Sequence, residues 1–90
     1  MSDDMHNEIN SLYEAIISLN SKEECKEFFE DLCTYKEIES MAQRLQAAKL
    51  LVNGDTYEQI IDKTGISSAT LSRVSKCVKY GTGYKNLFNK

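Results

Sequence analysis

The chain has 90 residues, of which 41% are hydrophobic and 28% charged, and its formal net charge is −3. This length allows one small domain with a thin core. Three cysteines without a C-x-x-C pair, and a single histidine far along the chain from Cys77, argue against a disulfide framework and a metal site. No stretch is long and apolar enough to cross a bilayer, and no signal segment opens the chain. We therefore expect a reduced cytoplasmic protein without a membrane partner.

Residues 1–20 are predicted to form one long amphipathic helix. Its apolar side chains recur at alternating steps of four and three residues, a period typical of helix–helix seams: Met5, Ile9, Leu12, Ile16 and Leu19. Tyr13 and Ile17 widen this surface beyond what a small core would cover. Burial in a homodimer is therefore expected, and packing within the monomer is the alternative.

Two further helices are predicted before residue 54. Ser21 and Glu24 fit a capping box, which predicts a helix from Lys22 to about Leu32 whose core side chains are Phe28, Phe29 and Leu32. Thr34 and Glu37 repeat the same pattern and open a helix from Tyr35 to Val52, which Gly54 ends. We expect one face of that helix to be buried: Ile38, Met41, Ala42, Leu45, Ala48 and Val52.

The segment from Thr56 to Gly81 predicts a helix-turn-helix. Thr56 caps a short helix over 57–63, Gly65 makes the turn, and Ser67 or Ser68 caps a second helix over 68–79. The expected core side chains are Ile60 and Ile61 on the first helix, Ile66 under the turn, and Leu71, Val74 and Val78 on the second. An ordinary helix pair in an all-helical core is the alternative interpretation.

The charge of the chain is distributed unevenly. Residues 1–43 hold 11 acids and 3 bases, whereas residues 44–90 hold 3 acids and 8 bases. From Ile66 to the C-terminus there is no acid, against five bases: Arg73, Lys76, Lys79, Lys85 and Lys90. A basic tract on and after the second helix suits contact with phosphates, and the acidic half indicates a localised contact. A basic face that is merely solvated is the alternative.

The outward side chains of the second helix are the candidate DNA-binding residues. Short hydroxyls and methyls near its start allow close approach to base edges, and the basic side chains reach phosphate or guanine. The candidates are Ser67, Ser68, Ala69, Thr70, Ser72, Arg73, Lys76 and Lys79. After Gly81, residues 82–90 form a tail in which Tyr84, Leu87 and Phe88 dock as a short helix or fray.

No catalytic constellation is visible, and we do not expect an enzyme. The lone histidine is near the terminus, no Walker-type loop occurs, and the paired glutamates lie at predicted helix starts, where the dipole favours acids. A helical adaptor that binds another protein is the alternative to a DNA-binding regulator. The acid-free C-terminal tract favours DNA, since a protein partner gives no general reason to exclude acids.

From about Leu32 to Gly81 the chain resembles the Trp repressor family, in its small Trp-repressor-like branch. The resemblance is carried by LCTYKEIESMAQRLQAAKLLVNG, TYEQIIDKTG and SSATLSRVSKCVKYG. It implies an all-α fold of five to six helices in one domain over 1–90, with 1–53 as dimerisation scaffold and 56–81 as helix-turn-helix. It also implies an intertwined homodimer that binds a palindromic operator in double-stranded DNA and acts as a sequence-specific transcriptional repressor.

The resemblance further implies a ligand site. In the tryptophan-binding members, two arginines and a threonine carbonyl hold the corepressor, and the matching residues here are Arg44, Arg73 and Thr34. Val74 stands where those members have a glycine beside the ligand, and Cys77 where they have a ligand-contacting serine. Tryptophan, another amino acid, a different small carboxylate, or no ligand at all remain alternatives. From the residues alone, Arg44 could equally pair with an acid of the N-terminal half.

Overall fold

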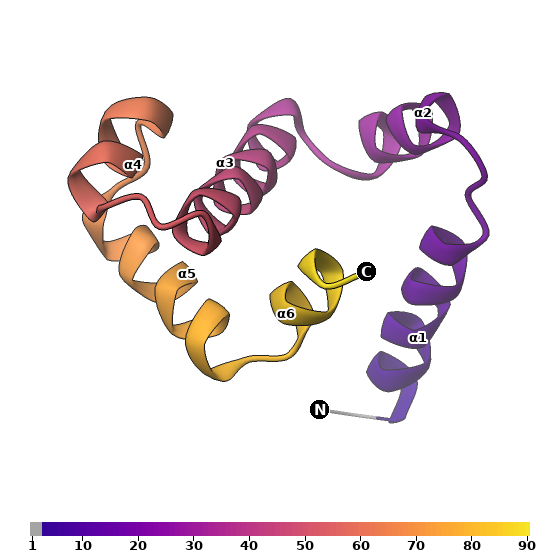
Figure 1. The fold of residues 1–90 in the computed structure, drawn as a ribbon. Helices are drawn as coiled ribbons and strands as arrows, with labels where there is room; N and C mark the ends of the chain where they lie inside the picture. The colour runs from indigo at the N-terminus through magenta and orange to yellow at the C-terminus, as the bar shows by residue number, and fades with distance from the viewer. Residues whose placement is uncertain (1–2) are drawn as a thin grey trace. The chain divides into compact units, whose positions relative to one another are not determined.

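The computed structural model describes residues 3–90, and over this range the chain is all helical, with six helices and no strand. Their bounds are α1 Asp3–Ile17, α2 Lys22–Leu32, α3 Tyr35–Val52, α4 Tyr57–Thr64, α5 Ser68–Tyr80 and α6 Gly83–Phe88. The expectation of an all-α chain with five to six helices is confirmed (Figure 1). The predicted start of the first helix, at residues 1–2, lies outside the described residues.

The chain divides into two compact units, Met1–Tyr35 and Lys36–Lys90. In the described part of the N-terminal unit, neither α1 nor α2 has a buried side chain. Its aromatic contact is the edge-to-face pair of Phe28 and Phe29, whose ring centroids are 5.4 Å apart. Leu32, predicted to lie in the core, is 51% exposed in the single chain.

The start of α2 corrects one detail of the predicted capping box. Ser21 caps the helix as expected, because its hydroxyl oxygen accepts a hydrogen bond from the Glu24 backbone N–H at 3.1 Å. The Glu24 carboxylate, however, accepts from the backbone N–H of Asn20 at 3.4 Å rather than from that of Ser21. The Glu24 side chain is therefore hydrogen-bonded to Asn20, the residue before the N-cap.

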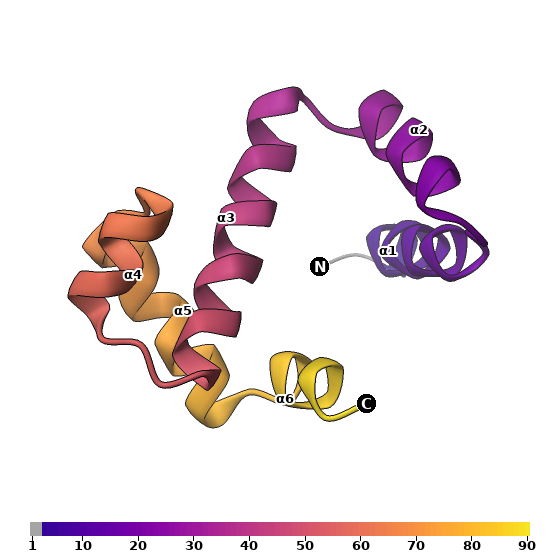
Figure 2. The same cartoon turned by 45° about the horizontal axis from the view of Figure 1, so that its top comes forward.

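The core of the C-terminal unit joins α3, α4, the following turn and α5. Its fully buried side chains are Ala47, Ala48, Ile60, Ile66, Leu71 and Val74, with partly buried side chains of α3 to α6 packed against them. Figures 1 and 2 show α3 alongside the α4–α5 pair, with α6 following the C-terminal end of α5. The helix-turn-helix core predicted from the spacing is confirmed at Ile60, Ile66, Leu71 and Val74.

The buried face of α3 differs from the predicted one. Ala48 is buried as expected, but Met41 is 37% and Val52 54% exposed, and Ala47 is fully buried in their place. The C-terminal half of α3 carries apolar residues on several sides, so helical period alone did not select one face. Two adjacent alanines form the contact because their small side chains allow the neighbouring helices to approach closely.

Gly65 is expected to be the residue of the turn least tolerant of a side chain. Its φ of 73° and ψ of 9° place it in the left-handed region at the end of α4. We expect Gly65→Ala to lower the free energy of unfolding by about 1–2 kcal/mol, the usual strain of an L-residue in this region. Urea denaturation followed by circular dichroism measures it. Gly83→Ala in α6, where a Cβ meets nothing within 4 Å, is the control and should not destabilise.

Candidate nucleic-acid interface

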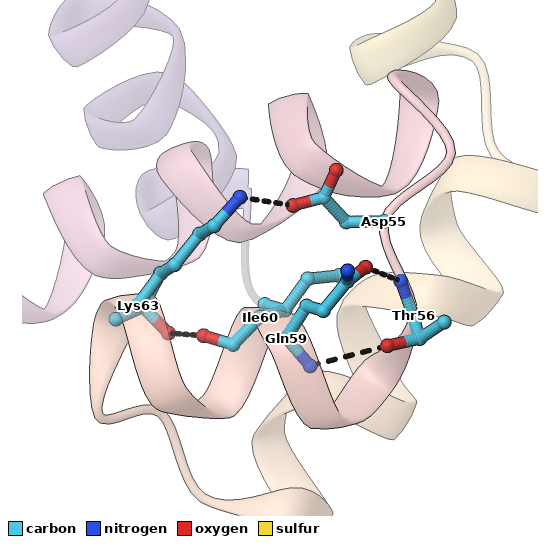
Figure 3. A network of polar contacts seen from close by, with 6 residues as sticks. Asp55, Thr56, Gln59, Ile60 and Lys63 are labelled. Carbon is cyan, nitrogen blue, oxygen red and sulfur yellow. Dashed lines mark hydrogen bonds and ion pairs between the residues drawn. The ribbon is translucent and has the colours of Figure 1, made fainter.

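The first helix of the pair, α4, is held at its start by reciprocal hydrogen bonds. The Thr56 hydroxyl accepts from the Gln59 backbone N–H at 3.2 Å, and the Gln59 side-chain oxygen accepts from the Thr56 backbone N–H at 2.9 Å (Figure 3). Lys63 from the last turn reaches back to Asp55 with an N–O distance of 2.7 Å. These contacts fix both ends of a helix of only 8 residues, which would be marginal alone.

The turn between α4 and α5 is also fixed by side chains. The Thr64 hydroxyl donates to the Ile60 carbonyl at 2.7 Å and accepts from the Ile66 backbone N–H at 3.2 Å. From α3, the Gln43 side-chain amide donates to the Thr64 carbonyl at 2.9 Å. Ile66 is 2% exposed, so the turn is anchored by apolar burial as well as by polar contacts.

The second helix, α5, begins at a serine cap and presents a polar outer face. The Ser67 hydroxyl accepts from the Thr70 backbone N–H at 3.2 Å, which satisfies a free donor of the first turn. The same hydroxyl donates to the Thr70 hydroxyl at 2.9 Å. Thr70 is half-buried, and the other candidate DNA-binding residues are exposed: Ser67, Ser68, Ala69, Ser72, Arg73, Lys76 and Lys79.

The charge of the chain is separated between the two units. Residues 1–35 carry nine acids and two bases, a net charge of −7, whereas residues 36–90 carry five acids and nine bases, a net charge of +4. The α5 helix contains no acid. Lys85 of α6 donates to the Lys79 carbonyl at 2.8 Å, which places a further positive charge at the C-terminal end of α5.

The three residues of the predicted ligand site lie on separate segments. Arg44 is half-buried on α3, and its Nη1 donates to the Ser40 hydroxyl at 2.9 Å. Arg73 is exposed on α5, and Thr34 is exposed in the N-terminal unit, just before α3. The guanidinium of Arg44 therefore has the Ser40 hydroxyl as a partner on its own helix.

Two surface grooves lie elsewhere on the C-terminal unit. One runs between α3 and α4 and is lined by Glu39, Ala42, Gln43, Gln46, Lys63 and Thr64. The other lies between α5 and α6 and is lined by Cys77, Gly81, Gly83, Tyr84 and Leu87. Neither of these grooves is lined by Arg44 or Arg73, so neither supports the predicted ligand site.

Sequence reasoning missed the roles of Gln43 and Lys85 in shaping the site, and the burial of Ser75. Gln43 holds the turn, Lys85 caps the end of α5, and Ser75 is a polar residue of α5 that is 8% exposed. Ser75 lies four residues after Leu71, so helical spacing could have placed it on the buried face. Gln43 is 21 residues from Thr64 in the chain, and no local pattern reports such a contact.

The described residues contain no group of three or more His, Cys, Asp or Glu side chains that could hold a metal ion. Within the same part of the chain, no helix has the length and hydropathy required to cross a membrane.

Comparison with known proteins supplies relatives over most of the chain. The family model described as Trp repressor protein matches residues 7–90. The YerC protein of Bacillus subtilis (strain 168), whose function is uncharacterized, is 51% identical over 74 residues, which are 82% of this chain and 71% of that one.

Two solved structures share the fold. A Staphylococcus aureus protein named provisionally as a Trp repressor has a TM-score of 0.88 at 42% identity, over 92% of this chain and 84% of that one. A TrpR-like protein from Eubacterium eligens ATCC 27750 has a TM-score of 0.89 at 44% identity, over 92% of this chain and 87% of that one.

Proposed function

The chain belongs to the Trp repressor family, a family of regulators rather than enzymes, and from this we propose that it is a sequence-specific DNA-binding transcriptional regulator. Its expected action is repression, through a palindromic operator bound by a homodimer. The observation that carries the proposal is α5, a capped helix whose outer face is exposed, free of acids and supplied with Arg73, Lys76 and Lys79. Such a helix suits the major groove of DNA.

The homodimer in this proposal is supported by the N-terminal unit. The described parts of α1 and α2 bury no side chain within one chain, and several large apolar side chains are exposed there: Met5, Tyr13, Ile17 and Leu32. Helices with this much exposed apolar surface gain stability when a partner covers it. A second copy is the partner that a palindromic operator requires, because a two-fold dimer presents two reading helices.

A small carboxylate, such as an amino acid, is the proposed corepressor class. Arg44 and Arg73 are the two arginines of the chain, and a guanidinium binds a carboxylate through two parallel hydrogen bonds. Val74, which is 2% exposed, is part of the core of the C-terminal unit. Because Val74 stands where the tryptophan-binding members have a glycine beside the ligand, its larger side chain favours a ligand smaller than one with an indole ring.

A salt titration tests DNA binding against the adaptor alternative. Binding of the wild-type protein to a generic duplex, followed by fluorescence anisotropy, should weaken steeply with salt because bound phosphates release counterions. A dimer with three basic side chains per reading helix contacts about six phosphates, which corresponds to a slope of about −5 in log K against log salt. Absence of DNA binding at low salt would favour the alternative, a helical adaptor that uses the same surfaces to bind another protein.

Thr70→Ser is expected to change sequence preference without removing DNA binding. The variant keeps the hydroxyl that bonds to Ser67 but lacks the methyl group, which is the part suited to a thymine methyl. One base position should lose preference, by about 1 kcal/mol, the lower range for a specific base contact. Selected-duplex sequencing measures it, and an unchanged base preference at every position would remove Thr70 from the reading surface.

A further inference from the structure

Gln43 of α3 contacts the turn of the helix-turn-helix with its side-chain amide. Its Nε2 donates to the carbonyl of Thr64 at 2.9 Å across 21 residues of chain. The same nitrogen lies 3.9 Å from the position that a Cβ on Gly65 would occupy. The amide therefore lies against both residues at which α4 ends and the turn begins.

The Thr64 carbonyl needs a hydrogen-bond donor from outside α4. Thr64 is the last residue of α4, and the final carbonyls of a helix have no partner within it. Thr64 is tied in turn to the Ile60 carbonyl and to the Ile66 backbone N–H. A movement of the Thr64 carbonyl relative to α3 would therefore also move the turn. Since α5 starts two residues after Ile66, the start of α5 would move with the turn.

The core contact between α3 and the pair is apolar. Ala47 and Ala48 meet the core side chains of α4 and α5, and apolar burial has no preferred direction. Beside Gln43 the surface opens into the groove between α3 and α4, so side chains do not fill that side. A hydrogen bond depends on angle as well as distance, so it restricts rotation that alanine methyls permit.

We infer that Gln43 is a positioning residue that sets the angle of the helix-turn-helix on α3 and thereby the half-site spacing that the dimer accepts. This inference rests on the proposed function. The two reading helices of a dimer must match half-sites about one helical turn apart. One added base pair moves a half-site by about 3.4 Å and rotates it by about a tenth of a turn. A dimer whose helix-turn-helix is held at a fixed angle therefore rejects the altered spacing, whereas a dimer in which this angle can vary accepts it.

The experiment measures spacing preference on duplexes selected by the wild-type protein. The two half-sites are kept and the spacer between them is shortened or lengthened one base pair at a time, in competition binding. Gln43→Met keeps the length of the side chain but cannot donate a hydrogen bond. Gln43→Glu keeps its shape, and its ionised carboxylate only accepts hydrogen bonds. Gln46→Met is the matched control, since Gln46 is an exposed α3 residue lining the same groove.

Both Gln43 variants should broaden the spacing preference. The ratio between the best spacing and its neighbours should fall by about threefold to tenfold, the range that corresponds to one hydrogen bond. Amide exchange in the DNA-free protein should accelerate at Gly65 and Ile66 but not in the middle of α5, and Gln46→Met should behave as the wild type in both measurements. A residue with only a structural role would lower affinity for all spacings equally.

The inference is overturned if both Gln43 variants keep the sharp spacing profile of the wild type, whatever their exchange rates. If the wild-type protein selects no duplex at all, the proposed function fails instead. In that case the exchange rates at Gly65 and Ile66 still decide whether Gln43 holds the turn.

Discussion

Leu71→Ala should lower the free energy of unfolding by about 2–5 kcal/mol, which is the cost of removing a buried leucine side chain and leaving a cavity. Leu71 is fully buried on α5 and packs in the core with Ile60 of α4 and the alanines of α3. A domain of this size has about 5–15 kcal/mol of stability in total, so one substitution removes a large share of it.

Urea denaturation followed by circular dichroism measures the effect, at one fixed protein concentration because a dimer is also stabilised by association. Ser72→Ala, on the same helix but exposed, is the control and should stay within about 0.5 kcal/mol of the wild type. A loss for Leu71→Ala no larger than that of the control would show that this core does not hold the C-terminal unit together.

Lys76→Ala should weaken binding to every duplex, specific or not, and flatten the salt dependence. Lys76 is exposed on α5, three residues from Arg73 and three from Lys79, so it shares their basic face. A lysine that neutralises one phosphate contributes about one unit to the slope of log K against log salt, so a dimer that loses both copies should lose about two.

Lys26→Ala provides the matched control for this measurement. Lys26 is an exposed lysine of α2, in the unit that carries a net charge of −7, and its removal changes the total charge equally. Its salt slope should equal that of the wild type. If Lys26→Ala and Lys76→Ala changed the slope by the same amount, binding would depend on net charge rather than on a contact made by α5.

The boundaries of α2 to α5 could be predicted because the chain marks them with local signals, whereas α1 ends at Ile17 rather than at residue 20 as predicted. Ser21, Thr56 and Ser67 cap helices through bonds to backbone groups three residues away, and Gly65 adopts the positive φ expected of a turn. Each signal acts within one turn of helix, so the sequence alone contains it. The pairing of α4 with α5 followed for the same reason, from apolar spacing within a short segment.

The features that escaped prediction depend on contacts between distant residues. The buried face of α3 is selected by what packs on it, and its apolar residues lie on several sides, so Ala47 was not expected in the core and Met41 was. The bond from Gln43 to Thr64 joins residues 21 positions apart. Neither the helical period of apolar residues nor a capping pattern indicates such a contact, because both involve only residues close together in the sequence.

Selection of bound duplexes from a random pool, with and without a mixture of amino acids, tests the central claim most directly. The account predicts enrichment of a palindrome with half-sites about one helical turn apart. Dependence on one amino acid would in addition identify the corepressor and support the roles of Arg44 and Arg73. Recovery of no enriched sequence under either condition, from protein whose helices are intact by circular dichroism, would contradict the assignment of α5 as a sequence-reading helix.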